Sequence, residues 1–388
     1  MSVRTRDSLG GRAAIAGIGA TDFSKDSGRS ELTLAVEAVH AALDDAGLVP
    51  ADVDGMVTFT MDTSPEITVA QAAGMGELSF FSRVHYGGGA ACATVQQAAL
   101  AVATGVAEVV VCYRAFNERS GRRFGSGVQQ REPSAEGAAL GWQLPFGLLT
   151  PASWVAMIAQ RYLHTYGLTP DAFGHVAVTD RRHAATNPAA YFYGKPITLD
   201  DHAASRWIAE PLRLLDCCQE TDGGQAIVVT STERARDLRR PPAVIEAAAQ
   251  GAGRNQEAMT SFYRDGLTGL PEMGVVARQL WRTSGLAPGD IDVGILYDHF
   301  TPFVLMQLEE FGFCGKGEAA DFVAADALPL NTHGGQLGEA YLHGMNGIAE
   351  AVRQLRGTSV NQIPGAARTL VTAGTGVPTS GLILGTDG

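Results

Sequence analysis

A segment near the C-terminal end of the chain concentrates groups that could do acid–base chemistry. The residues NTHGGQLGEAYLHGMNG (331–347) include five glycines, two histidines, a glutamate and a tyrosine. Glycines at this density let a backbone turn sharply and approach a ligand closely. The pattern IAEAVRQLRG that follows predicts a helix ending at Gly357, and a helix N-terminus favours a negative charge. Tyr341 lies in the middle of the segment, so its phenol either packs there or reacts.

A second segment, IDVGILYDHFTPF, places polar side chains directly after an apolar strand. Tyr297, Asp298 and His299 would lie at the C-terminal end of that strand, where α/β folds build their sites. The alternative is that the tyrosine packs in the core or at its rim. If the strand continues, Asp298 and His299 point to opposite faces, so at most one of them shares a face with a ligand.

Two glycine-rich segments offer further candidate groups. In GGGAACATVQQ, Cys92 follows a glycine-rich turn at a predicted helix start, where the helix dipole favours a thiolate. Alternatively it is a small buried residue, because a free cysteine packs like an apolar side chain. The segment TAGTGVPTSG could present backbone N–H groups to an oxyanion, or it could form a plain hairpin.

Composition narrows the possible partners. The chain has 388 residues, 45% apolar and 18% charged, with a net charge of −12 and no run of Lys and Arg. These values argue against nucleic acid or an anionic membrane as the main partner. The five cysteines show neither a zinc-site spacing nor a disulfide framework. No signal-peptide core or membrane-length apolar run is found, so we expect a cytoplasmic protein.

The elements that must position these groups come in two similar sets. The segments AGLVPADVDGMVTF (46–59) and SGLAPGDIDVGILY (284–297) match at a glycine, a leucine, a proline and two aspartates. Each follows an amphipathic helical pattern and precedes a short apolar strand. Alternating strands and helices predict an α/β fold around mostly parallel sheets. The chain therefore reads as a tandem duplication.

The predicted boundary falls where charges and two prolines cluster, in RARDLRRPPAV. It divides the chain into an N-terminal half (1–240) and a C-terminal half (241–388). A long insertion, from about 115 to 220, occupies the first half and contains a helical pattern, PASWVAMIAQRYLHTYG. We expect this insertion to cap an active site.

The order of these motifs resembles the thiolase superfamily, specifically its sterol-carrier-protein type, over essentially the whole chain. The resemblance implies two pseudo-symmetric βα halves in a layered αβαβα arrangement. In that family a reactive cysteine follows an asparagine, and ACATV places Cys92 there. The family's His-Asp-x-Phe motif corresponds to Tyr297-Asp298-His299-Phe300, and the histidine of its glycine-rich motif falls on Tyr341.

The departures from the family pattern bear on the reaction. Both histidines are replaced by tyrosine, and the family's second cysteine falls near Ala373. A phenol with a pKa near ~10 is a poor partner for activating a thiol. The substitutions argue for loss of Claisen chemistry, and two protic replacements argue against a dead site.

Further segments, such as SRWIAEPLRLLDCCQETDGG and FTPFVLMQLEEFGFCGKGE, are similar to the thiolase-like lipid-transfer proteins that act as steroid side-chain aldolases in bacteria. This resemblance implies retro-aldol cleavage of a β-hydroxyacyl-CoA, a 17-hydroxy steroid C22-carboxyl-CoA, to a 17-ketosteroid and propionyl-CoA. Tyr297 would act as base and Tyr341 as acid, although the reverse is equally compatible with the sequence. Asp298 and His343 are candidate proton relays for a phenol.

Enolate stabilisation would come from an oxyanion hole. The resemblance implies the backbone N–H of Cys92 with that of Gly374 or Gly376. No cofactor and no metal site are expected beyond the CoA thioester substrate, and the three lysines lie outside the motifs.

The resemblance implies two partners, a second copy of the chain and a zinc-ribbon/OB-fold protein or hydratase domain. Two other functions stay open at this point. One is a thiolase or acyltransferase that uses Cys92, and the other is a non-catalytic acyl-CoA or lipid carrier.

Overall fold

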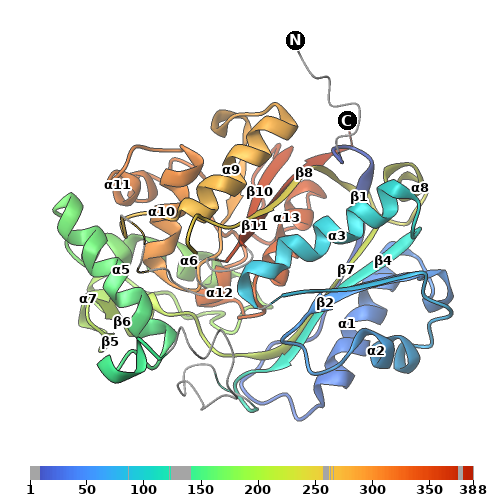
Figure 1. Ribbon diagram of the computed structural model, residues 1–388, viewed down its shortest axis with the longest axis horizontal. Coiled ribbons are helices and arrows are strands. Elements are labelled where there is room, and N and C mark those ends of the chain that lie inside the picture. Colours follow the sequence, from blue (N-terminus) through green and yellow to red (C-terminus); the bar gives the residue numbers. More distant parts are fainter. Residues whose placement is uncertain are drawn as a thin grey trace.

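The computed structural model describes residues 9–85, 87–121, 123, 141–256, 262, 264, 266–374 and 379–387. Figure 1 shows a large twisted sheet with helices on both faces. The elements of the N-terminal half before the insertion are β1 (Ala13–Ala20), α1 (Glu31–Ala46), the 3-10 helix η1 (Pro50–Asp52), β2 (Gly55–Phe59), α2 (Glu66–Ala73), β3 (Phe80–Val84), η2 (Gly88–Ala90), α3 (Ala91–Thr104) and β4 (Val109–Asn117).

The insertion follows β4 and ends before β7. Its described elements are η4 (Leu144–Phe146), α5 (Pro151–Tyr166), α6 (Asp171–Thr186), α7 (Leu199–Ala204), β5 (Trp207–Ala209), β6 (Leu212–Arg213) and η5 (Leu214–Asp216). Then come β7 (Asp222–Ser231) and α8 (Thr232–Arg236). The helix expected from PASWVAMIAQRYLHTYG is confirmed as α5.

The remaining elements repeat the plan of the first half. They are β8 (Ala243–Gly251), α9 (Pro271–Ser284), η6 (Pro288–Asp290), β9 (Val293–Ile295), α10 (Thr301–Phe311), α11 (Ala319–Ala324), α12 (Gly335–Gly338), α13 (Met345–Leu355), β10 (Arg368–Ala373) and β11 (Thr379–Thr386). The predicted boundary at 240/241 falls between α8 and β8.

The strand order reads the same outward from the centre of the sheet. The nine strands run β3-β2-β4-β7-β1-β8-β11-β10-β9, with β1 and β8 in contact. From that contact, β1, β7, β4 and β2 on one side correspond to β8, β11, β10 and β9 on the other. Parallel pairing of β2 with β4 is matched by parallel pairing of β9 with β10. The expectation of mostly parallel sheets is wrong, because five of the eight strand pairings described in this sheet are antiparallel.

Three buried clusters define the layers. Helices α1 and α2 cover one face of the N-terminal strands. Helices α3 and α13 lie between the strands of the two halves and pack against both. Helices α9 and α10, joined by α5 and α6 of the insertion, cover the outer face of the C-terminal strands. This layering confirms the predicted αβαβα arrangement.

The matched residues of the internal repeat make the same helix-ending and strand-capping contacts in both halves. Gly47 and Gly285 end α1 and α9 in the left-handed conformation, which glycine adopts without steric cost. Asp54 accepts hydrogen bonds from the backbone N–H groups at the start of β4, and Asp292 accepts them from those at the start of β10. The repeat is thus a set of caps that fix where one strand begins beside another.

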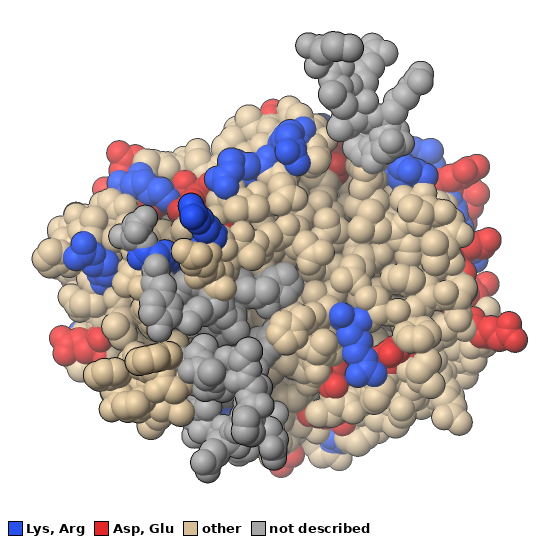
Figure 2. Space-filling model, in the orientation of Figure 1, with Lys and Arg blue, Asp and Glu red and all other residues tan. Residues whose placement is uncertain are grey.

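The charge distribution on the surface and the lengths of the helices are the features that bear on nucleic-acid and membrane partners. On the face shown in Figure 2, Lys and Arg side chains are interspersed with Asp and Glu and do not form a continuous basic strip. Within the described residues, no helix is long and apolar enough to cross a membrane.

Candidate active site

Two tyrosine hydroxyl groups meet at the centre of the candidate site. Tyr297 follows β9 and Tyr341 lies in the loop between α12 and α13, and their hydroxyl oxygens are 3.2 Å apart. Both residues are held by their backbones. The Tyr297 N–H donates to Thr372 Oγ1 at 2.9 Å, and the Tyr341 N–H donates to Thr221 Oγ1 at 2.6 Å. The structure thus brings together the two residues that the sequence selected from separate motifs.

A glycine turn from the N-terminal half completes this centre. A Cβ atom added at Gly88 would lie 1.8 Å from the Tyr297 hydroxyl oxygen, so only a glycine leaves room for the phenol. A Cβ atom added at Gly374 would lie 2.2 Å from the Gly89 Cα atom, so the end of β10 packs directly on the same turn. The turn that contains η2 therefore lies between the phenol and the C-terminal hairpin.

Cys92 lies apart from this centre. It is fully buried in α3, and its Sγ atom is 3.7 Å from the carbonyl oxygen of Val371. Burial raises the pKa of the Cys92 thiol far above its usual value, which opposes a thiolate. The atoms nearest to a Cβ added at Gly374 belong to Gly88 and Gly89, and the expected pairing of the Cys92 and Gly374 N–H groups stays a prediction. Gly376, the other expected donor, lies outside the described residues.

Asp298, an expected relay, is a backbone cap. Its carboxylate accepts hydrogen bonds from the N–H groups of Gln336 and Leu337 at 2.8 and 2.9 Å, at the start of α12. Burial raises its pKa, while a hydrogen bond from Asp180 of α6 and the two backbone donors oppose that rise. Asp298 thus ties the strand end that carries Tyr297 to the glycine-rich loop that carries Tyr341.

His343, the second expected relay, lies beside Tyr341, with their ring centroids 4.9 Å apart. Its Nδ1 atom accepts a hydrogen bond from Arg114 Nε at 2.9 Å. Arg114 is buried in β4 and forms an ion pair with Asp62. Neither Arg114 nor Asp62 could be selected from the sequence, because an arginine within an apolar strand gives no sign that it faces a site.

Burial controls the ionisation of the tyrosine pair. It raises the pKa of Tyr297 well above its usual value, although the hydrogen bond from Tyr341 lowers it. Burial likewise raises the pKa of Tyr341. Charge on Glu118 or Cys218 would raise both pKa values further. Glu118 is itself buried directly after β4, a position at a strand end that the sequence analysis could have noted.

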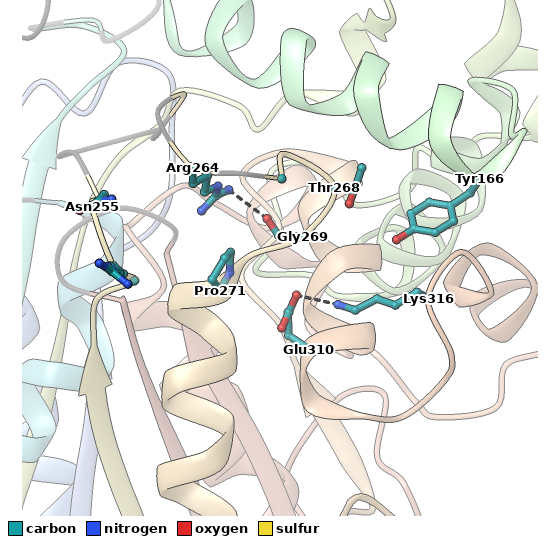
Figure 3. Close-up of a pocket in the computed structure, with 11 residues that line it drawn as sticks. Tyr166, Asn255, Arg264, Thr268, Gly269, Pro271, Glu310 and Lys316 are labelled. Atoms are coloured by element: carbon teal, nitrogen blue, oxygen red, sulfur yellow. Dashed lines mark hydrogen bonds and ion pairs between the residues drawn. The ribbon is translucent and has the colours of Figure 1, made fainter.

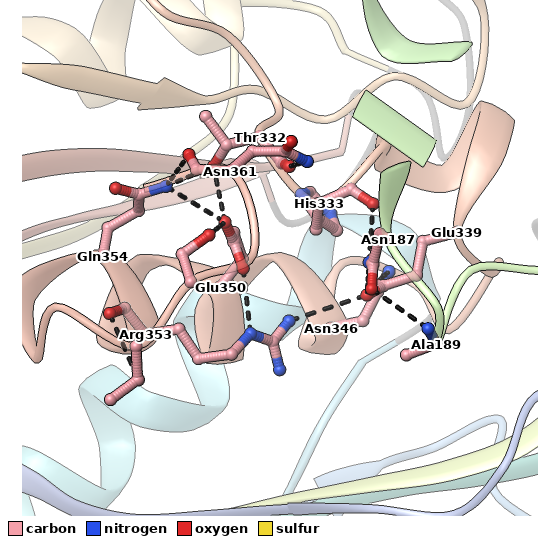
Figure 4. A network of polar contacts seen from close by, with 12 residues as sticks. Asn187, Ala189, Thr332, His333, Glu339, Asn346, Glu350, Arg353, Gln354 and Asn361 are labelled. Atoms are coloured by element: carbon pink, nitrogen blue, oxygen red, sulfur yellow. Dashed lines mark hydrogen bonds and ion pairs between the residues drawn. The ribbon is translucent and has the colours of Figure 1, made fainter. Parts of the chain in front are cut away.

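Glu339 of the same loop anchors structure rather than facing the tyrosines. Figure 4 shows its carboxylate among amide groups from the insertion and from α13. It accepts hydrogen bonds from Asn187 Nδ2 at 3.0 Å and Asn346 Nδ2 at 2.8 Å. Arg353 is 3.6 Å from Glu339 and also pairs with Glu350 at 2.9 Å. This network fixes the loop between the insertion and α13.

A cavity of about 630 Å³ lies elsewhere, between the C-terminal ends of α5 and α10 and the loop before α9. Figure 3 shows the ion pair of Lys316 with Glu310 and the hydrogen bond from Arg264 to the carbonyl oxygen of Gly269. None of the predicted site residues lines it. Among the described residues, no cluster of three His, Cys, Asp or Glu side chains is arranged to hold a metal ion.

Comparisons with known proteins place this geometry in a family. The family model "Thiolase C-terminal domain-like" matches residues 253–386. The chain is 69% identical over 387 residues to the steroid side-chain-cleaving aldolase of Thermomonospora curvata, covering 98% of this chain and 99% of that protein. It is also 69% identical over 386 residues to the 17-hydroxy-3-oxo-4-pregnene-20-carboxyl-CoA lyase of Mycobacterium tuberculosis, covering 97% and 100%.

Solved structures are also similar to this chain. One titled "Ltp2-ChsH2(DUF35) aldolase" superposes with a TM-score of 0.94 at 69% identity, covering 98% of this chain and 99% of that chain. Human mitochondrial 3-ketoacyl-CoA thiolase superposes with a TM-score of 0.68 at 16% identity, covering 97% and 99%, a likeness that concerns the fold alone.

Proposed function

The chain belongs to the steroid side-chain-cleaving aldolases of the thiolase superfamily, and from that premise we propose its substrate and its proton-transfer groups. The substrate is a β-hydroxyacyl-CoA, a 17-hydroxy steroid C22-carboxyl-CoA. The products are a 17-ketosteroid and propionyl-CoA. The name of the relative from Mycobacterium tuberculosis supports this substrate class. The observation that carries the proton-transfer proposal is the 3.2 Å contact between the hydroxyl groups of Tyr297 and Tyr341.

The reaction moves one proton from oxygen to carbon. As the substrate's hydroxyl loses its proton, a C=O bond forms and the bond to the carbon next to the thioester breaks. The electron pair of that bond becomes a thioester enolate, which takes a proton at carbon. One tyrosine accepts the hydroxyl proton while it passes its own proton to the other tyrosine, and the second tyrosine protonates the enolate.

The raised pKa of both phenols suits a concerted transfer. A free phenolate would be costly in this buried setting, because burial disfavours the charged form. In a concerted transfer neither tyrosine carries a full charge. Tyr297 is assigned as base and Tyr341 as acid, and the pair serves equally well in the reverse order. The direct contact removes the need for Asp298 as a relay, since its carboxylate already binds two backbone N–H groups.

The enolate oxygen requires hydrogen-bond donors. Backbone N–H groups of the glycine turn that contains η2, together with the end of β10 at Gly374, are the proposed donors, because these backbones pack on each other beside Tyr297. Removing one such donor costs about 3–4 kcal/mol of barrier in other enzymes. The CoA thioester is the substrate, and the proposed reaction uses no further cofactor.

Two protein partners belong to the proposal. A solved relative carries a second component in its title, "ChsH2(DUF35)", which supports a complex with a zinc-ribbon/OB-fold protein or hydratase domain. A homodimer fits the sheet, because β3 forms one edge and exposes Phe81 there. A cytoplasmic location is also part of the proposal.

The two other functions are less well supported by the geometry. A thiolase needs a thiolate in reach of its acid–base groups, whereas the Cys92 thiol is buried against β10. A carrier has no need for two hydroxyl groups held in contact at the junction of both halves.

The deciding experiment measures cleavage by the protein with its partner. Wild type, Tyr297→Phe and Tyr341→Phe are given the 17-hydroxy steroid C22-carboxyl-CoA, and ketosteroid and propionyl-CoA are followed. We expect cleavage by wild type, a loss of at least ~100-fold in kcat for each variant, and near wild-type activity for the exposed control Tyr193→Phe. Substrate binding without cleavage by wild type would return the chain to the carrier function. Acylation of Cys92 would favour the thiolase function.

A further inference from the structure

Arg114 is a buried cation that the proposed reaction does not yet use. It lies in β4 and is only 1% exposed. Its Nη1 atom pairs with Asp62 Oδ1, and its Nε atom donates to His343 Nδ1 at 2.9 Å. Asp62 is itself fixed, since it accepts a hydrogen bond from Thr58 Oγ1 at 2.7 Å. The guanidinium is therefore held from one side and directs one N–H group at the imidazole.

This contact dictates the form of the imidazole. A guanidinium can only donate, so Nδ1 of His343 must be an acceptor and the ring's hydrogen must be on Nε2. The groups described around the ring are Arg114 with Asp62 behind it, Tyr341 on the same loop, and His299 after β9. Burial, then the Arg114 charge, then His299 lower the pKa of His343 well below its usual value. The ring is a neutral N–H donor.

The Nε2 atom lies beside the glycine turn that also contacts the Tyr297 phenol. A Cβ atom added at Gly87 would lie 3.2 Å from His343 Nε2, and one added at the next residue, Gly88, would meet the Tyr297 hydroxyl. The N–H group of the imidazole and the phenol thus lie against consecutive residues of one glycine turn. His343 has φ +53°, a left-handed conformation that is uncommon for residues other than glycine.

We propose that Arg114 is a positioning residue that fixes the tautomer and orientation of His343, so that His343 Nε2–H donates to the thioester oxygen as the enolate forms. This inference rests on the proposed aldolase reaction and assigns it a side-chain oxyanion donor. It also replaces the expected role of His343 as a proton relay, because an imidazole whose Nδ1 binds a guanidinium has no free nitrogen to take up a proton. Asp62 keeps Arg114 in place.

A double-mutant cycle tests whether Arg114 acts through His343. In the complex with the partner, Arg114→Met is combined with Asp62→Asn, so that no lone carboxylate stays buried, and is measured with and without His343→Ala. We expect His343→Ala to lower kcat by ~10²–10³-fold, as for other oxyanion donors. The Arg114→Met pair should lower kcat by about tenfold or more alone and have no further effect in the His343→Ala background. Additive losses would overturn the inference.

The pH profile separates this role from a purely structural one. Without Arg114, the neutral ring can lose its Nε2 hydrogen to the other tautomer or turn away. Protonation places hydrogens on both nitrogens. The kcat of the Arg114→Met pair should therefore recover as pH falls, at a pH below the ordinary imidazole pKa of about 6.5, because burial still lowers the pKa of His343. The matched control, Arg114→Gln with Asp62→Asn, keeps an amide donor and should retain more activity at pH 8. A loss equal at every pH, or equal in both pairs, would contradict the role.

A measurement on wild type covers the case in which these variants fail to fold. Nitrogen-15 NMR of histidine-labelled protein, with the His343 signals assigned from a His343→Gln spectrum, reports the tautomer directly. We expect an unprotonated Nδ1 and a protonated Nε2 with no titration between about pH 5.5 and 8. A hydrogen on Nδ1 would overturn the inference even if the aldolase reaction is confirmed. Absence of cleavage by wild type would instead count against the proposed function.

Discussion

A buried phenol is a weak base by itself, and a second phenol at hydrogen-bond distance changes what it can do. With the hydroxyl groups of Tyr297 and Tyr341 in contact, a proton can enter at one oxygen and leave from the other without a free phenolate. The raised pKa values of both phenols disfavour a free phenolate, although Tyr297 is buried and Tyr341 only half-buried. At the scale of the residue, the reaction depends on the position of two oxygens.

The space for one of these oxygens depends on Gly88. Gly88→Ala would place a Cβ atom 1.8 Å from the Tyr297 hydroxyl oxygen, so the phenol must move away from Tyr341. We expect kcat to fall by at least ~100-fold, because a displacement of about 1 Å in a reacting group has that effect. Steady-state kinetics measure it. Gly76→Ala, where an added Cβ meets no atom, is the control, and equal kcat values in the two variants would contradict this geometry.

Cys92 serves packing in this structure. Cys92→Ala should retain most of the wild-type kcat, because the Sγ atom points to the Val371 carbonyl and not to the tyrosines. The free energy of unfolding should fall by about 1 kcal/mol from the lost buried volume. Kinetics and chemical denaturation measure the two effects. A covalent acyl-enzyme detected by mass spectrometry in wild type, and absent in the variant, would show the opposite.

The duplicated βα unit works at the scale of the element. In each half an aspartate after the 3-10 helix binds the first backbone N–H groups of a neighbouring strand, so that β2 meets β4 and β9 meets β10 in a fixed register. The same caps appear twice because each half contains a pair of parallel strands whose register depends on where the second strand begins.

Removing either cap should therefore cost a similar amount. Asp54→Ala and Asp292→Ala should each lower the free energy of unfolding by about 1.5–3 kcal/mol, the cost of hydrogen bonds to a charged acceptor. The double variant should lose the sum to within about 0.5 kcal/mol, because the two caps share no partner. Urea denaturation measures all three. A double variant no less stable than either single one would show that the caps are not independent.

These elements also show how far the sequence leads. The repeat and its alternating pattern predict the α/β halves because caps and periodicity are local properties. Tyr297 follows a predicted strand and Tyr341 lies in a glycine-rich segment, and both could be selected because they fall where the thiolase resemblance places histidines. The sequence could not show that Gly88 and Gly89 pack against Gly374, since three consecutive glycines leave the start of the helix undefined. Nor could it pair Arg114 with His343, because the contact joins residues far apart in the chain.

At the scale of the whole molecule, the insertion and the two halves close over a core that contains neutral histidines. Burial lowers the pKa of His299 to about 3, whereas the same imidazole has a pKa of about 6.5 in the unfolded chain. Between these values the unfolded state binds one more proton than the folded state. Stability from this residue is therefore complete above pH 6.5 and is lost as pH falls toward 3.

The pH dependence of unfolding tests this prediction. The stability difference between wild type and His299→Gln should change by about 1.4 kcal/mol per pH unit between about pH 5.5 and 4, with wild type losing more. Denaturant titrations at several pH values measure it. Comparing the two proteins cancels the other buried groups, and parallel curves would mean that His299 is protonated in the folded state.

The contact between β1 and β8 joins two halves that contribute different kinds of residue to the candidate site. Both phenols, Gly374 and His343 come from residues 241–388, whereas the glycine turn, Arg114 and Thr221 come from residues 1–240. The second half therefore supplies the groups proposed to react, and the first half supplies residues that hold them in place. A polypeptide severed between α8 and β8 would leave two inert pieces, and activity would return only when they reassemble, which makes this junction a natural place to divide the enzyme.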